Sequence, residues 1–160
     1  MNKKIIYLVN HSSFFVSHRL ELAKEVGKLF DVLLVYGKQS SKTTEPKAIE
    51  SIKKHNIKSK KININNNGFL RLLDFFGFIN FIYIIFKFKP DIVHTVSPIA
   101  NLIGGMTLIF FKNIKLVMSI SGMGFLFTGN SLFKKIFSSI YLIIFKLILN
   151  KNKLEINKLK

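Results

Sequence analysis

The segment DIVHTVSPIANLIGG, from Asp91 to Gly105, decides the fold class of this chain. Its first residues predict a short buried strand. Pro98 predicts the first turn of a helix, where the amide proton that proline lacks would have no partner. Ser97, just before it, is a favourable N-cap residue. A strand that leads directly into a helix is typical of parallel α/β sheets, which bind ligands beyond the carboxyl ends of their strands. His94, Thr95 and Ser97 are therefore predicted to face a crevice.

Short apolar runs alternate with longer helical patterns along the rest of the chain. Between residues 10 and 30, Val16, Leu20 and Ala23 predict one apolar row of an amphipathic helix, and Leu22, Val26 and Leu29 predict a second. Strands are predicted over 5–9, 31–36, 57–64, 91–96 and 115–119, and further helices over 45–55, 69–88, 98–111 and 131–150. This alternation predicts a doubly wound, Rossmann-like parallel sheet of about five strands in one domain, 1–150, with 151–160 as an irregular tail.

The chain is strongly basic, with 25 Lys and Arg against 8 Asp and Glu and a formal net charge of +17. Such a charge predicts attraction to an anionic surface. A general composition rich in Lys, Asn, Ile and Phe explains much of the excess positive charge equally well. Only two arginines are present and most Phe residues lie in apolar runs. We therefore expect an anionic membrane surface as a partner, and no nucleic acid.

The remaining composition limits the cell compartment and the class of site. The chain has no cysteine, which excludes a disulfide scaffold and a Cys-based metal site. The apolar run near the amino terminus is too short for a signal peptide, so a cytoplasmic location is expected, peripheral on the inner face of the cell membrane. The histidines lack metal-ligand spacing, and no metal or cofactor is predicted.

Two apolar segments bear on membrane contact. The segment 69–88 is about as long as a bilayer-spanning helix, but Arg71 and Asp74 lie inside it. A packed or interfacial helix is favoured, and a spanning anchor is the alternative. In the segment 131–150, lysines fall within one arc of the predicted helix. A core helix with a solvated stripe and a helix lying on anionic lipid explain that pattern equally well.

Three polar segments are predicted to meet at one edge of the sheet. His11, Ser12 and Ser13 follow the first strand, where a helix can offer backbone N–H groups to an anion. The first and fourth strands are neighbours in the common doubly wound order, so this turn and His94 would flank one crevice. The third segment, Gly122-Met123-Gly124, follows the fifth strand, and its glycines permit close approach to a ligand. No dinucleotide fingerprint or P-loop is present.

Three stretches together resemble one enzyme family. They are HSSFFVSHRLELAKEV, KPDIVHTVSPIANLIGG and SISGMGFLFTGNS. They resemble the N-terminal half of family-4 retaining glycosyltransferases, nearest to those that extend polyprenyl-diphosphate-linked sugars for capsule, O-antigen or related glycans. The resemblance implies a GT-B architecture of two Rossmann-like domains. The N-terminal domain would bind the acceptor and dock on the membrane, and the C-terminal one would bind the nucleotide-sugar donor, without a metal.

Carried over to this chain, the resemblance assigns roles to the candidate residues. The loop at His11 would border the donor diphosphate and acceptor, His94 with Ser97 would line the acceptor side, and the turn at Gly122 would lie near the transferred sugar. Arg19, in the first of the three stretches, is counted among the substrate-binding residues. No catalytic residue is assigned.

The chain also departs from that family. Many relatives have a His close to the Gly-x-Gly turn, where this chain has Ser119-Ile120-Ser121, and the donor domain's paired glutamates do not occur. We therefore expect half an enzyme, truncated or completed by a separate donor-binding chain, and inactive alone. The alternatives are a non-catalytic Rossmann-like module that binds a phosphorylated ligand, and a membrane protein anchored by 69–88.

Overall fold

The computed structural model describes residues 2–38, 43–65, 72–111, 113–119, 138–139, 141–143 and 145–150. Five parallel strands form one sheet in the order β3-β2-β1-β4-β5. The strands are β1 (Lys3–Val9), β2 (Phe30–Lys38), β3 (Lys58–Asn65), β4 (Ile92–Val96) and β5 (Lys115–Ser119). The helices are α1 (Ser12–His18), α2 (Leu20–Val26), α3 (Thr44–Lys54), α4 (Leu72–Phe88) and α5 (Pro98–Leu108). The predicted doubly wound α/β fold is confirmed, including the pairing of the first strand with the fourth.

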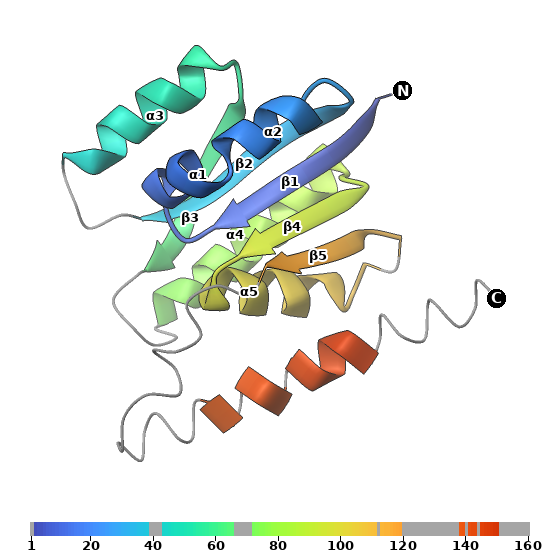
Figure 1. Ribbon diagram of the computed structural model, residues 1–160. Coiled ribbons are helices and arrows are strands. Elements are labelled where there is room, and N and C mark those ends of the chain that lie inside the picture. Colours follow the sequence, from blue (N-terminus) through green and yellow to red (C-terminus); the bar gives the residue numbers. More distant parts are fainter. Residues whose placement is uncertain are drawn as a thin grey trace.

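Helices cover both faces of the sheet (Figure 1). Ile6 and Leu8 of β1 point into a core closed by α4 and α5, whereas Tyr7 and Val9 point into a core closed by α1, α2 and α3. β1 lies at the centre of the sheet and is buried on both faces. Its continuous run of apolar side chains therefore matches its position, as expected for a parallel sheet covered by helices.

The described residues between 138 and 150 lie against α5. Tyr141 and Ile148 are buried, and a Cβ atom added to Gly105 would collide with the Ile148 side chain. A larger residue at position 105 would therefore require the Ile148 side chain to move. Among the described residues no helix is long and apolar enough to cross a membrane. The predicted tail, 151–160, lies outside the described residues.

The first predicted helix is in fact two. Arg19, with φ −132° and ψ −12°, separates α1 from α2. Leu20 and Ala23 of α2 are buried. In the second predicted row Val26 packs against the core, but Leu22 and Leu29 are exposed, so the prediction was wrong for these two. Successive helical residues are turned by about 100°, so a residue two positions after the buried Leu20 points away from the sheet.

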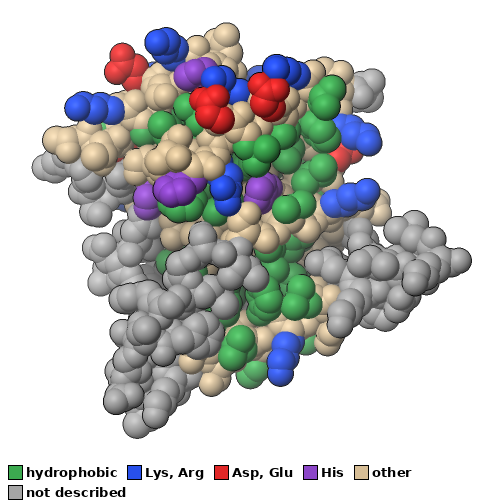
Figure 2. All heavy atoms as spheres, viewed as in Figure 1, with side chains coloured by type: hydrophobic (Ala, Val, Ile, Leu, Met, Phe, Trp, Pro, Cys, Tyr) green, Lys and Arg blue, Asp and Glu red, His purple; other side chains and the backbone are tan. Residues whose placement is uncertain are grey.

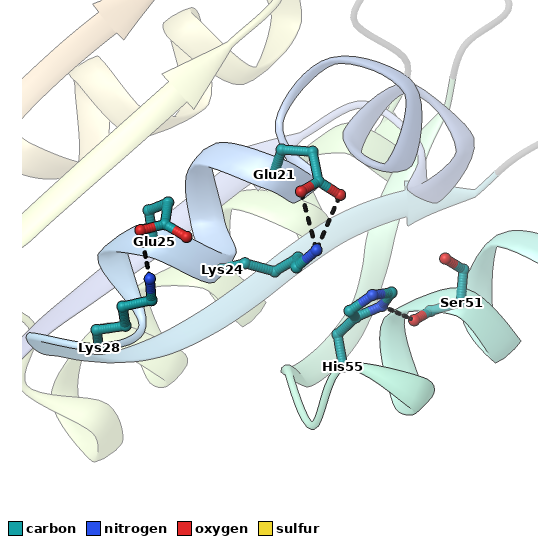
Figure 3. Close-up of polar contacts among 6 residues, drawn as sticks. All are labelled: Glu21, Lys24, Glu25, Lys28, Ser51 and His55. Atoms are coloured by element: carbon teal, nitrogen blue, oxygen red, sulfur yellow. Dashed lines mark hydrogen bonds and ion pairs between the residues drawn. The ribbon is translucent and has the colours of Figure 1, made fainter.

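The outer surface of α2 carries ion pairs between residues three apart (Figure 3). Lys24 pairs with Glu21 at 2.8 Å and Lys28 with Glu25 at 2.6 Å. At the end of α3, His55 donates from Nδ1 to the carbonyl oxygen of Ser51 at 2.8 Å. The two exposed ion pairs contribute little to the free energy of unfolding, because water and salt screen them. This side of α2 is a solvated surface, as its charged residues predicted.

Candidate functional site

The candidate site lies where β1 and β4 end side by side. Val9 and Val96, the last residues of the two strands, are partners in the parallel register. Asn10 and His11 follow the first of them, and Ser97 follows the second. The two loops therefore leave the sheet at the same edge, as predicted from the expected pairing of the first and fourth strands.

Ser97 ties the two loops together. Its Oγ–H donates to Oδ1 of Asn10 at 2.5 Å, and it makes no side-chain capping bond to α5. Ser97 does occupy the predicted N-cap position, with a φ of 92° and a ψ of 153°. Its side chain bonds to Asn10 instead of capping the helix. This backbone region is nearly restricted to glycine, and a residue held there costs about 1–3 kcal/mol. One strained residue therefore lies at the predicted ligand-binding edge.

His11 caps α1. Its Nδ1 accepts from the backbone N–H of Phe14 at 3.2 Å and lies 3.0 Å from Oγ of Ser13. Burial lowers the pKa of His11, which favours the neutral ring that can accept these bonds. The amide of Phe14 is thus already satisfied within the protein. Ser12 points inward instead, and its buried Oγ has no hydrogen-bond partner within the described structure.

His94 is almost fully buried on the face of the sheet that carries α1 and α2. Its Nε2 lies 2.8 Å from Oγ of Ser119, the last residue of β5, and its ring centroid lies 5.1 Å from that of Tyr7. Burial first, and then the positive charge of Arg19, lower the pKa of His94. The ring is therefore held neutral, able to donate one hydrogen bond and accept another.

Thr95 does not face the crevice, contrary to the prediction. Side chains alternate along a strand, so Thr95 points to the face opposite His94. There its Oγ1–H donates to Oδ1 of Asn101 at 2.7 Å, and Nδ2–H of Asn101 donates to the carbonyl oxygen of Ser119 at 3.1 Å. Ser119 is consequently held from both faces of the sheet, by His94 on one side and by Asn101 on the other.

Arg19 lies at the break between the two short helices. Its Nη1–H donates to the carbonyl oxygen of His18 at 2.9 Å, while its Nε is buried without a partner. His18 itself stacks on Phe14, with ring centroids 4.5 Å apart. Figure 2 shows His side chains on either side of a Lys or Arg side chain on this face. Arg19 therefore supplies a positive charge near the neutral ring of His94.

The structure thus brings together most of the predicted residues, in two groups. His11 and Ser97 lie on the loops with Ser13 in the first turn of α1, whereas His94 lies within β4 and Arg19 at the break between α1 and α2. Ser12 is turned inward. Gly122, Met123 and Gly124 lie outside the described residues, and their contribution stays a prediction.

Sequence reasoning missed four residues of the site. Asn10 and Ser119 stand directly at strand ends, so the rule that selected His11 could have found them. Asn101 occurs within an apolar helix, where a buried amide is a signal of a polar contact. Tyr7 is surrounded by apolar residues in β1, and nothing in that run distinguishes it.

The chemistry available at this edge is hydrogen bonding by hydroxyl, amide and neutral imidazole groups, next to one guanidinium. Such groups suit sugar hydroxyls and phosphate oxygens. Across the described residues, no three metal-ligating side chains of the His, Cys, Asp or Glu type come together. Two hollows of the surface lie elsewhere, one between α3 and Lys61 and another near Lys4 and Asp31 at the amino ends of the strands.

Comparisons with known proteins place the chain in a family. A sequence model described as "Glycosyl transferase 4-like" matches residues 4–154. The chain therefore belongs to the glycosyl transferase 4-like family. No curated protein sequence matches it.

Solved structures share the fold. A glycosyltransferase from Rickettsia africae has a TM-score of 0.55 at 20% identity, with 82% of this chain and 35% of that chain covered. MurG of Acinetobacter baumannii has a TM-score of 0.53 at 16% identity, with 75% and 36% covered. A structure described as a putative UDP-N-acetylglucosamine 2-epimerase from Listeria monocytogenes has a TM-score of 0.55 at 17% identity, with 77% and 32% covered. The chain spans about a third of the length of these proteins.

Proposed function

We propose that this chain binds the acceptor in a glycosyltransferase that acts in surface polysaccharide synthesis. The acceptor is a sugar linked to a polyprenyl diphosphate, and the transferred sugar comes from a nucleotide-sugar. The observation that carries this proposal is the set of polar groups near the carboxyl ends of β1, β4 and β5, with His11 and Ser97 on the loops and His94 in contact with Ser119. Its groups are hydrogen-bond donors and acceptors of the kind that hold sugar hydroxyls.

The donor would be held mainly by a second Rossmann-like domain, on a longer form of the chain or on a separate chain. The chain of 160 residues alone should then show no sugar transfer. In this proposal the described domain contributes the acceptor half of the cleft, and the turn at Gly122 lies near the transferred sugar.

A membrane-linked acceptor requires the domain to reach a lipid surface. The outward side of α4 carries four exposed apolar residues, Phe76, Ile79, Tyr83 and Phe86, which we call the α4 stripe. Their spacing of three and four residues places them on one side of the helix. Together with the net charge of +17, the α4 stripe supports peripheral docking on the anionic inner face of the cell membrane.

The proposal is tested by binding of a polyprenyl-diphosphate sugar to the pure chain in detergent micelles. We expect binding that depends on the sugar and that weakens in the variant Ser97→Ala. The same lipid without its sugar is the comparison. Equal binding with and without the sugar would favour the alternative of a non-catalytic phosphate-binding module, and no binding of either lipid would contradict both. Sugar transfer by the pure chain would contradict the need for a second domain.

A further inference from the structure

The inner guanidinium nitrogen of Arg19, Nε, is buried without a hydrogen-bond partner among the described residues. Buried donors are nearly always hydrogen-bonded, and one left unsatisfied costs about 1–3 kcal/mol. None of the four ion pairs among the described residues includes Arg19. The guanidinium is thus neither neutralised nor fully satisfied by the protein.

The surroundings of Arg19 are those of a ligand site. Its positive charge acts on both Tyr7 and His94, opposing the rise in the pKa of Tyr7 and adding to the fall in that of His94. Its Nη1 end is exposed. The rings of Tyr7 on β1 and His94 on β4 lie 5.1 Å apart, centroid to centroid, so a charge that acts on both lies near the face where these strands meet.

The adjacent part of that face is open. The described helices on this side pack on β1, β2 and β3, and β4 and β5 lie uncovered beside them in Figure 1. Val117 of β5 is the register partner of His94 and is 46% exposed. Ser119, two residues further, brings its hydroxyl to the same face. We call this surface, formed by Val117 and Ser119 with the buried ring of His94 behind them, the β4–β5 ledge.

We propose that Arg19 binds a diphosphate group on the β4–β5 ledge, with Ser119 and His94 supplying hydrogen bonds beside it. A guanidinium matches two phosphate oxygens at once, and charge-assisted bonds of this type are roughly twice as strong as neutral ones. The unsatisfied Nε–H gains an acceptor when the side chain turns toward the ligand. This inference rests on the proposed function, because either substrate of that reaction carries a diphosphate.

The test begins with inorganic pyrophosphate and the full chain, measured by titration calorimetry at near-physiological salt. Because the chain is so basic, a matched control for non-specific attraction is needed. Arg19→Gln and Lys24→Gln remove one positive charge each, and Lys24 lies on the outer side of α2. We expect Arg19→Gln to weaken binding at least about tenfold, and Lys24→Gln to leave it within about twofold. Equal binding by the three proteins, or none by the unmodified chain, would overturn the proposal.

A second readout does not depend on a variant that folds. The groups that face His94 are Tyr7, Arg19 and Ser119. A bound anion favours the imidazolium form, so pyrophosphate should raise the pKa of His94 as followed by NMR, while the His55 signals stay in place. An unchanged His94 titration at saturating pyrophosphate would contradict the proposal.

A conservative variant tests the geometry of the cation. Arg19→Lys keeps the charge but loses the planar guanidinium, and should bind pyrophosphate less tightly than the unmodified chain.

Two further ligands identify the source of the diphosphate. UDP represents the donor and farnesyl diphosphate the lipid acceptor, and Arg19→Gln should weaken whichever of them binds. If pyrophosphate binds through Arg19 while the lipid-linked sugar does not bind, the proposed function fails and the diphosphate subsite stands. If the lipid-linked sugar binds and Arg19→Gln has no effect on any ligand, the subsite fails and the proposed function stands.

Discussion

The Nε2 atom of His94 and the Oγ atom of Ser119 lie 2.8 Å apart, and this contact joins β4 to the last residue of β5. Asn101 holds the carbonyl group of Ser119 from the other face of the sheet, at 3.1 Å. The chain therefore leaves β5 from a point fixed on both sides. The predicted turn at Gly122 begins three residues later, so these contacts set the start of the segment expected to approach the substrate.

His94 should make the stability of the protein depend on pH. Its pKa in the folded state lies below the ordinary value of about 6.5, so near pH 6 the unfolded chain binds more protons than the folded one. The linkage relation then requires the free energy of unfolding to be greatest above pH 6.5 and to fall as the pH decreases through the folded pKa. The lowered pKa of His11 acts in the same direction.

Urea denaturation at several pH values between 5 and 7.5 measures this effect. We expect His94→Gln to reduce the loss of stability between the two ends of that range, because the variant lacks one of the groups that bind extra protons on unfolding. If the variant loses as much stability as the unmodified chain, His94 is not held neutral by its surroundings.

Asn101 and Thr107 provide a matched pair of buried polar residues on α5. Asn101→Ala leaves the Thr95 hydroxyl and the Ser119 carbonyl without a partner, and should lower the free energy of unfolding by about 2–4 kcal/mol. Thr107 has a buried hydroxyl with no partner in the described structure. Thr107→Val should be neutral or stabilise by up to about 1 kcal/mol. Urea denaturation measures the free energy of unfolding of both variants. Equal losses would contradict a stabilising role for the hydrogen bonds of Asn101.

The sequence was sufficient for the order of elements but less so for the directions of side chains. Continuous apolar runs such as Ile5–Val9 are required by a sheet covered on both faces, so the strands could be recognised. The break at Arg19 carries no proline or glycine, and tertiary packing decides it. The orientation of Thr95 could have been predicted from strand alternation alone.

For the site, position was predictable and individual bonds were not. The carboxyl-end rule led to His11 and Ser97, which follow the ends of β1 and β4, whereas His94 lies within β4, two residues before its end. It could not show that Ser97 bonds to Asn10 rather than to α5, because that choice depends on an unusual backbone conformation. The partners of His94 come from β1, β5 and Arg19, which only the assembled fold brings together.

The strain at Ser97 can be separated from its hydrogen bond. Ser97→Ala and Ser97→Gly both remove the bond to Asn10, but only glycine adopts a φ of 92° without a steric penalty. After allowing for the greater freedom of glycine in the unfolded chain, we expect Ser97→Gly to be more stable than Ser97→Ala by about 1 kcal/mol or more. Thermal and urea denaturation would show this order, and the reverse order would mean that Ser97 is not strained.

The α4 stripe gives the membrane-docking proposal a direct test. Phe76 and Tyr83 are each more than half exposed, so replacing both with Ser should leave the free energy of unfolding nearly unchanged. If these side chains enter the lipid, each contributes about 1.5–3 kcal/mol on full burial. The double variant should then bind vesicles containing phosphatidylglycerol at least about tenfold more weakly in co-sedimentation.

Leu29 supplies the matched control for this experiment. It is 73% exposed and lies between α2 and β2, on the opposite side of the sheet from α4. Leu29→Ser should therefore leave vesicle binding unchanged, because that side would face the solvent. Raising the salt concentration weakens the attraction between lysines and anionic lipid but not the apolar contact. Weak residual binding at high salt that disappears in the double variant would assign that remainder to the α4 stripe. Unchanged binding by the double variant would instead show that charge alone holds the protein to the vesicle.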